Sequence, residues 1–291
     1  MAKRLETDDP AAAEQEAGPS GLLERTLGVL ELLAAHAHGL QLYEIADRLG
    51  IPRSATHRVL TSLVEQGYVR QERQLGAYQL TAKIASLAFS FLAGSGITDF
   101  AQPILDRLAR DAGELVRLAL VDGRELVWVA KSQGSPFGLR YDPDMGQVGR
   151  LSCSASGHAW LSCLPEEEAL ALVEKQGYGS REEFGPRAPQ TKAALLRYIR
   201  QARQRGFSLV VQTYSAWMNA TAAPIRRPQT GEVIGAVVIA GLHNRLTEEK
   251  MLSLSPLLLE AARELSLAMM VTPTLAPRRA SGASNFFDTP A

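Results

Sequence analysis

Cysteines and long apolar runs are both scarce in this sequence. Only two cysteines, Cys153 and Cys163, occur among 291 residues, which excludes a small secreted scaffold held together by disulfides. The longest apolar run, VIGAVVIAGL, is too short for a membrane helix of ~20 residues, and the N-terminal MAKRLETDDPAAAEQEAG has no apolar signal core. We therefore expect a cytoplasmic protein with reduced thiols and no membrane partner.

Recognisable catalytic and cofactor motifs are also missing. The sequence contains none of the motifs G-x-S-x-G, H-E-x-x-H, Walker A and G-x-G-x-x-G, which mark common hydrolase, metalloprotease and nucleotide-binding sites. The stretch LSCSASGHAWLSC holds Cys153, His158 and Cys163, but their spacing does not put all three on one helical face, and no fourth ligand has zinc-like spacing. We predict no enzyme, no metal and no cofactor. A hydrolase that uses one cysteine with His158 stays open as an alternative, although no orienting acid or oxyanion motif accompanies it.

Net charge is absent as well, because 31 basic side chains balance 31 acidic ones. A neutral total does not exclude nucleic-acid binding, since a local basic patch is sufficient for it. Residues 51–83 carry five basic and two acidic side chains, a net charge of +3. The basic excess is therefore local and modest.

The segment from residue 21 to 81 has the pattern of three helices followed by a β-hairpin. In the first helix, LLERTLGVLELLAAH, Leu23, Leu27 and Leu30 form an apolar stripe at helical spacing. The second, LYEIADRLG, ends at Gly50, a residue type that commonly terminates helices. Two strand-like runs around a polar turn follow the third helix. This order of elements predicts a winged helix-turn-helix domain.

The third helix, in IPRSATHRVLTSLVEQGYVR, has an apolar side and a polar, basic side. Pro52 suits its first turn, and Val59, Leu60, Leu63 and Val64 have the spacing of a core-facing stripe. The remaining side chains suit phosphates and base edges, as in helices that enter the major groove of double-stranded DNA. We predict DNA contacts from the helix and the hairpin by Arg53, Ser54, Thr56, His57, Arg58, Arg70 and Arg73.

Beyond residue 81 the pattern changes. The run AKIASLAFSFLAG predicts a linker helix within residues 82–98. Residues 99–272 alternate helices with strands, including a hairpin around a DG dipeptide, and predict an antiparallel sheet. Residues 1–20 and 273–291 are expected to be disordered tails. The fold class is therefore α+β, with two domains joined by a helix.

Three blocks of sequence together resemble the IclR family of bacterial transcriptional regulators over residues 21–270. They are ERTLGVLELLAAH…LYEIADRLGIPRSATHRVLTSLVEQGYV…YQLT, LSCSASGHAWLSCLPEE, and GFSLVVQTYSAWMNATAAPI…EVIGAVVIAG. The resemblance implies an N-terminal winged helix-turn-helix, a linker helix and a GAF-like C-terminal domain that binds a small effector. It also implies homodimers or dimers of dimers, and control of the catabolism of organic acids or aromatic compounds.

The resemblance also implies an effector pocket, carried over by position. Its residues here are Ala155, Ser156, Gly157, His158, Val210, Ala220, Val238 and Ala240. Three of them, Val210, Val238 and Ala240, lack the polar groups common in the family, and His158 stands where lysine is frequent.

An apolar pocket penalises a highly polar ligand, so we expect an aromatic or otherwise apolar acid and not glyoxylate or pyruvate. Phe137, Tyr214 and Trp217 would add aromatic surface, and a helix N-terminus with His158 or Arg140 would hold a carboxylate. The alternative is that the pocket side chains only pack the sheet and the ligand binds elsewhere.

These expectations describe a ligand-responsive transcription factor that binds operator DNA as a dimer. Its partners would be double-stranded DNA, a small organic acid and a second copy of the chain. A constitutive DNA-binding protein whose second domain only oligomerises is the remaining alternative.

Overall fold

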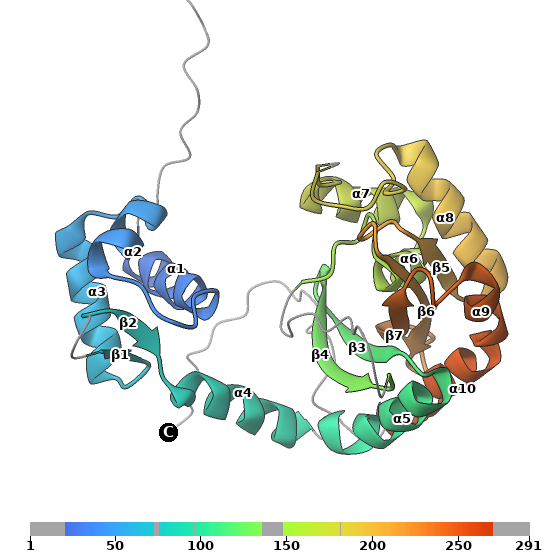
Figure 1. The fold of residues 1–291 in the computed structure, drawn as a ribbon, viewed down its shortest axis with the longest axis horizontal. Helices are drawn as coiled ribbons and strands as arrows, with labels where there is room; N and C mark the ends of the chain where they lie inside the picture. The colour runs from blue at the N-terminus through green and yellow to red at the C-terminus, as the bar shows by residue number, and fades with distance from the viewer. Residues whose placement is uncertain (1–20, 73–75, 96, 136–147, 181, 270–291) are drawn as a thin grey trace, which may run out of the picture. The chain divides into compact units, whose positions relative to one another are not determined.

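A computed structural model of the chain describes residues 21–72, 76–95, 97–135, 148–180 and 182–269 (Figure 1). The chain divides into two compact units, residues 1–91 and 92–291. The predicted tails, residues 1–20 and 273–291, lie outside the described residues. Within the described part of the chain, no helix combines the length and the hydrophobicity that crossing a membrane requires.

The N-terminal unit contains the three predicted helices and the predicted hairpin. Its elements are α1 (Leu22–Ala34), α2 (Leu42–Leu49), α3 (Arg53–Glu65), β1 (Val69–Gln71) and β2 (Tyr78–Leu80), the two strands being antiparallel. Gly50 ends α2 in the left-handed region, at φ 62°, which few other residue types adopt without strain. The prediction of a winged helix-turn-helix is confirmed.

The core of this unit gathers around one side of each helix. Val29 and Leu33 of α1 pack with Ile45 of α2, Leu60 of α3 and Tyr78 of the hairpin. The two strands of the hairpin thereby pack against α1 and α3.

Two details of the predicted core are wrong. Leu23 and Leu27 are 72% and 48% exposed. The helix α1 has apolar residues on several of its sides, and the side that is buried is the one with Val29 and Leu33. Val64 of α3 is 39% exposed, whereas Ala55, one turn before Val59, is buried. When a helix has apolar residues on several sides, the elements that pack against it decide which side is buried. The periodicity of the helix alone does not show this.

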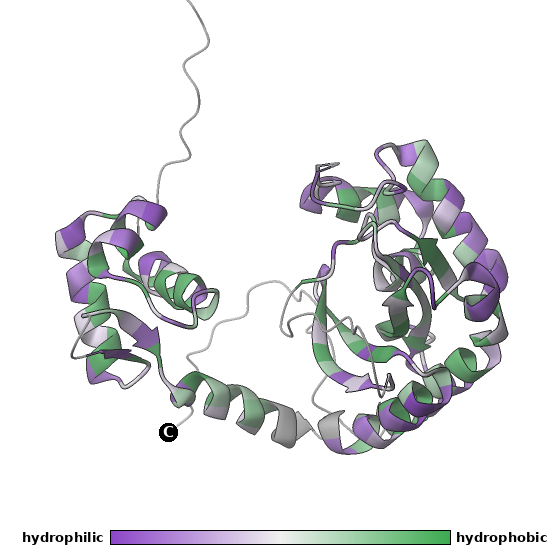
Figure 2. Ribbon diagram, viewed as in Figure 1, coloured by the Kyte–Doolittle hydropathy of each residue, from purple (hydrophilic) through white to green (hydrophobic). Residues whose placement is uncertain are grey.

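The helix α4 (Ala82–Ser95) follows β2, within the segment predicted as a linker. Leu87, Phe89 and Phe91 are 60%, 68% and 59% exposed, so the described part of α4 presents large apolar side chains to solvent. Figure 2 shows this apolar character along the helix.

The C-terminal unit is built on a five-stranded antiparallel sheet with the order β4-β3-β7-β6-β5. The strands are β3 (Leu115–Asp122), β4 (Glu125–Gln133), β5 (Ser208–Val211), β6 (Met218–Arg226) and β7 (Val233–Leu242). The helices are α5 (Ile97–Ala112), α6 (Ala155–Leu161), α7 (Glu166–Gln176), α8 (Lys192–Arg205), α9 (Glu248–Ser253) and α10 (Ser255–Ala268). The predicted α+β class and antiparallel sheet are confirmed.

Helices cover the two faces of this sheet (Figure 1). Side chains alternate along each strand, so Val116, Leu118 and Leu120 of β3 pack towards α5 and α10. Ala119 faces the other way, into a second apolar cluster formed with α6, α7 and α8. The face that carries α6 is the one that holds the candidate effector site.

Gly157 brings α6 into close contact with the chain before it. A Cβ atom at this position would lie 2.6 Å from the carbonyl oxygen of Leu151, closer than real Cβ contacts allow. The absence of a side chain at Gly157 therefore serves packing.

We predict that Gly157→Ala lowers the free energy of unfolding of the C-terminal unit by about 1–3 kcal/mol, because the backbone has to shift. All three tryptophans lie in this unit, so their fluorescence during urea unfolding reports on it alone. The matched control is Gly149→Ala, whose Cβ would lie at an ordinary 3.6 Å from the Trp128 ring. Equal stability of the two variants would contradict the assignment.

Candidate DNA-binding surface and effector cavity

The exposed side of α3 is polar and basic, and its other side is buried. Arg53, Ser54, His57 and Arg58 are exposed together with Thr61, at the spacing of one helical face. The turn from Gly50 to Pro52 ends α2 and leads directly into the first residue of this face, Arg53.

Thr56 does not belong to the exposed face, so its predicted DNA contact is wrong. Its side chain is fully buried, and its hydroxyl group donates to the carbonyl oxygen of Pro52 at 3.2 Å. Thr56 follows Ala55 on the core side of the helix, where its hydroxyl group is bonded back to the first turn.

Of the two hairpin arginines predicted to contact DNA, the structure describes one. Arg70 on β1 is exposed, and its Nη2 donates to Gln79 Oε1 at 3.1 Å. Arg73 lies outside the described residues. Lys83, counted in the local charge excess, donates to the carbonyl oxygen of Gln66 at 2.7 Å and lies over the Tyr68 ring. Lys83 therefore joins the start of α4 to the segment that follows α3.

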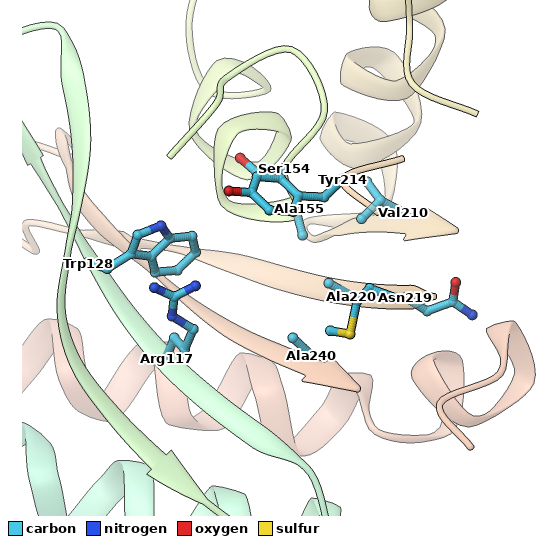
Figure 3. A pocket seen from close by; sticks show the side chains of 10 residues that line it. Arg117, Trp128, Ser154, Ala155, Val210, Tyr214, Asn219, Ala220 and Ala240 are labelled. Atoms are coloured by element: carbon cyan, nitrogen blue, oxygen red, sulfur yellow. The ribbon is translucent and has the colours of Figure 1, made fainter. Parts of the chain in front are cut away.

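The cavity on the α6 face of the sheet brings together several predicted effector residues (Figure 3). Val210, Ala220 and Ala240 are directly paired across β5, β6 and β7, so they form one row on this face. Ala155, at the start of α6, and Tyr214 also line the cavity. Small side chains in the row leave space between the sheet and the helix.

Two hydrogen bonds hold the start of α6 over this row. The Ser208 hydroxyl on β5 donates to the carbonyl oxygen of Ala155 at 2.6 Å, and the Thr213 hydroxyl donates to that of Cys153 at 2.6 Å. Ser154 caps α6, accepting from the Gly157 N–H at 3.0 Å, so this N–H is already used within the protein.

The cavity is small. Its volume is about 40 Å³. A second hollow, lined by Trp160, Cys163 and Arg226 among others, has a volume of about 340 Å³. The first has the more apolar lining with few polar groups, which is typical of small-molecule sites.

Among the described residues, the other predicted effector positions do not line this cavity. Ser156 and Gly157 are buried in α6, and Val238 packs in the apolar cluster below it. Trp217 is 70% exposed in the turn before β6. Phe137 and Arg140 lie outside the described residues.

His158 is buried and neutral, so the predicted role of this residue in holding a carboxylate is wrong. Burial lowers its pKa to about 4. Its Nε2 lies 2.8 Å from the carbonyl oxygen of Ser152, and because a carbonyl only accepts, Nε2 carries the proton. The ring packs against Tyr198, with 5.0 Å between ring centroids.

The two cysteines do not form a nucleophile–base pair with His158. Burial raises the pKa of Cys153 to about 12 and also raises the pKa of Cys163. The Cys163 thiol donates to the carbonyl oxygen of Ala159 and accepts from Arg226 Nη2, at 3.3 and 2.9 Å. Neither thiol has the environment of an activated cysteine, which counts against the hydrolase alternative.

Five cavity residues were missed by sequence reasoning, namely Arg117, Trp128, Ser154, Met218 and Asn219. Arg117 of β3 is only 5% exposed, and its guanidinium carbon lies 3.7 Å from the ring centroid of Trp128 on β4. The available signal was a single arginine in the apolar run LVRLALV, which was interpreted only as part of a hairpin. Met218 and Asn219 complete the lining, and Asn219 Nδ2 donates to the Leu246 carbonyl oxygen at 2.8 Å.

We predict that His158 makes the C-terminal unit less stable as the pH falls. Its pKa is below the ordinary 6.5, so the unfolded chain binds the extra proton between pH 6.5 and about 4, and stability is lost through that window. This residue should contribute a loss of about 2 kcal/mol between about pH 7.5 and about pH 5.

The measurement is urea unfolding, followed by tryptophan fluorescence, across this pH range. His158→Gln keeps a donor for Ser152 and does not titrate, so its stability should depend less on pH than that of the wild type. His243→Gln, at a half-buried histidine of the same unit, is the matched control and should keep the wild-type slope. Identical slopes in all three proteins would contradict the assignment.

Comparison with known proteins identifies both units. The family model of the bacterial transcriptional regulator IclR C-terminal domain matches residues 89–267, and that of the IclR helix-turn-helix domain matches residues 22–73. The transcriptional repressor IclR of Escherichia coli (strain K12) is 29% identical over 262 residues, covering 89% of this chain and 94% of that protein.

Solved structures have the same fold. An IclR family transcriptional regulator from Brucella abortus is 26% identical, with a TM-score of 0.66, over 92% of this chain and 96% of that one. An IclR homolog from Microbacterium hydrocarbonoxydans, complexed with 4-hydroxybenzoate, is 21% identical, with a TM-score of 0.71, over 87% of this chain and all of that one. Since the C-terminal model alone matches more than half of the sequence, the chain belongs to the IclR family of bacterial transcriptional regulators.

Proposed function

We propose that α3 of this regulator binds operator DNA in the major groove and that the C-terminal cavity binds an organic acid that controls this binding. The observation that carries the first part is the division of α3 into a buried apolar side and an exposed side with Arg53, Ser54, His57 and Arg58. Arginine on such a face is suited to bidentate contact with guanine, and the hairpin is suited to contact with phosphate. An operator-binding protein of this kind works in the cytoplasm.

The regulator acts as a homodimer or a dimer of dimers in this proposal. The exposed apolar side chains of α4, Leu87, Phe89 and Phe91, support self-association, because surface of this kind is costly to leave in water. Operator sites for such dimers are expected to have two half-sites. The relatives named as repressors make repression the first mode of control to test.

The effector in this proposal is an aromatic or otherwise apolar carboxylic acid. The row of Val210, Ala220 and Ala240 offers no side-chain hydrogen bond, and Trp128 and Tyr214 provide aromatic surface. The 4-hydroxybenzoate bound to the Microbacterium homolog supports this class of ligand. Because the cavity has a volume of only about 40 Å³, a ring-sized ligand requires lining side chains to move aside.

We predict that Arg58→Ala weakens binding to an operator, selected from genomic DNA with the purified protein, by roughly 5–150-fold and relaxes specificity at one base pair. Arg70→Ala should weaken binding to all DNA sequences alike, and the salt dependence of the affinity should fall by about one counterion. Arg25→Ala removes the same charge from α1 and serves as the control. Titrations by fluorescence anisotropy measure all three, and wild-type affinity of Arg58→Ala would contradict the proposed role of α3.

We predict that benzoate-type acids raise the melting temperature of the wild-type protein in a saturable way, because ligands stabilise the state that they bind. A thermal-shift screen should include aliphatic keto-acids and sugar acids. A saturable shift with glyoxylate and none with aromatic acids would overturn the proposed effector class. No shift with any acid would favour the alternative in which the C-terminal unit only oligomerises.

A further inference from the structure

The effector cavity has two chemically different ends. Figure 3 shows the hydroxyl groups of Ser154 and Tyr214 on the side of the cavity where Arg117 and Trp128 lie. Val210 and Ala220 line the opposite side. Among the described residues that line the cavity, Arg117 carries the formal charge. A ligand that fits this arrangement has a charged or polar end and an apolar body.

The fold fixes Arg117 in this position. Its neighbours along β3, Val116 and Leu118, point into the core on the other face, so the guanidinium is directed to the α6 side. A register shift between Leu118 and Ala119 places Trp128 opposite Ala119, diagonally across from Arg117. Bulges of this kind commonly direct side chains at binding sites.

Stacking on Trp128 determines which part of Arg117 is presented to a ligand. The guanidinium carbon is 3.7 Å from the indole centroid, so one flat face of the guanidinium is covered. The N–H donors of a guanidinium lie in its plane, and they form a fork that matches the two oxygens of a carboxylate. In a buried site of low polarity, such a charge-assisted pair is stronger than at the surface.

We infer that Arg117, held flat against Trp128, is the anchor for the carboxylate of the effector, and that the cavity selects compact planar monocarboxylates over their neutral analogues. The apolar body of the acid then lies against the row of Val210, Ala220 and Ala240. This inference rests on the proposed effector function and specifies its chemistry. It replaces His158, which is neutral, as the group that recognises the acid.

The test compares benzoate with benzamide, which has the same ring and no charge, by isothermal titration calorimetry of the full-length protein. Wild type should bind benzoate at least about tenfold more tightly than benzamide, because a charge-assisted bidentate pair is lost with the amide. Arg117→Met should abolish this preference, losing about tenfold or more for benzoate and little for benzamide. Arg117→Lys, which keeps the charge without the fork, should bind benzoate with intermediate affinity.

Arg124→Met removes an exposed arginine of the same unit and is the matched control. Operator binding and urea unfolding of each variant check that it folds. Equal affinity of wild type for benzoate and benzamide would overturn the inference, and so would benzoate binding by Arg117→Met as tight as in wild type. In the latter case the aromatic-acid function itself would stand. Failure of wild type to bind either compound would overturn both.

Discussion

The strand register of the central strand β7 is the constraint on which the effector site depends. This strand pairs with β3 on one side and β6 on the other, and the pairing aligns Ala240 with Ala220 and with Leu115. A slip of one residue would turn Ala240 to the opposite face and bring Ile239 to the α6 side. The cavity would then be filled by a branched side chain instead of being lined by small ones.

The same register connects the two chemical features of the cavity. Arg117 pairs with Val238 on β7, one row away on the same face from the row of small residues that includes Ala240. The apolar floor and the cation are therefore consequences of one sheet alignment, and α6 closes the site through its hydrogen bonds to β5 and the turn after it. An acid bound there controls transcription only if it binds the DNA-competent and DNA-incompetent arrangements with different affinities.

Much of the fold could be predicted because local signals agreed with one another. Gly50 and Pro52 delimit two helices, and a hairpin follows, so the winged helix-turn-helix was evident from the order alone. The family resemblance also predicted Val210, Ala220 and Ala240 as pocket residues, whereas their pairing in one row across three strands is not visible in the sequence.

The errors have specific physical causes. The stripe through Leu23 was placed on the wrong side because apolar residues surround α1, and only its neighbours determine which of them are buried. Thr56 has a polar side chain but satisfies it within the first turn of α3, so polarity alone did not predict exposure. Arg117 and Trp128 are apart in sequence, and their stacking depends on a bulge that no local pattern indicates.

The affinity of the protein for its operator, measured by anisotropy without acid and with a saturating aromatic acid, tests the account most directly. We expect a change of at least about fivefold, because an effector that couples two sites has to change the affinity of one when it occupies the other. Unchanged operator affinity, with the acid shown by calorimetry to be bound, would contradict it. The C-terminal unit would then bind acids without controlling DNA recognition.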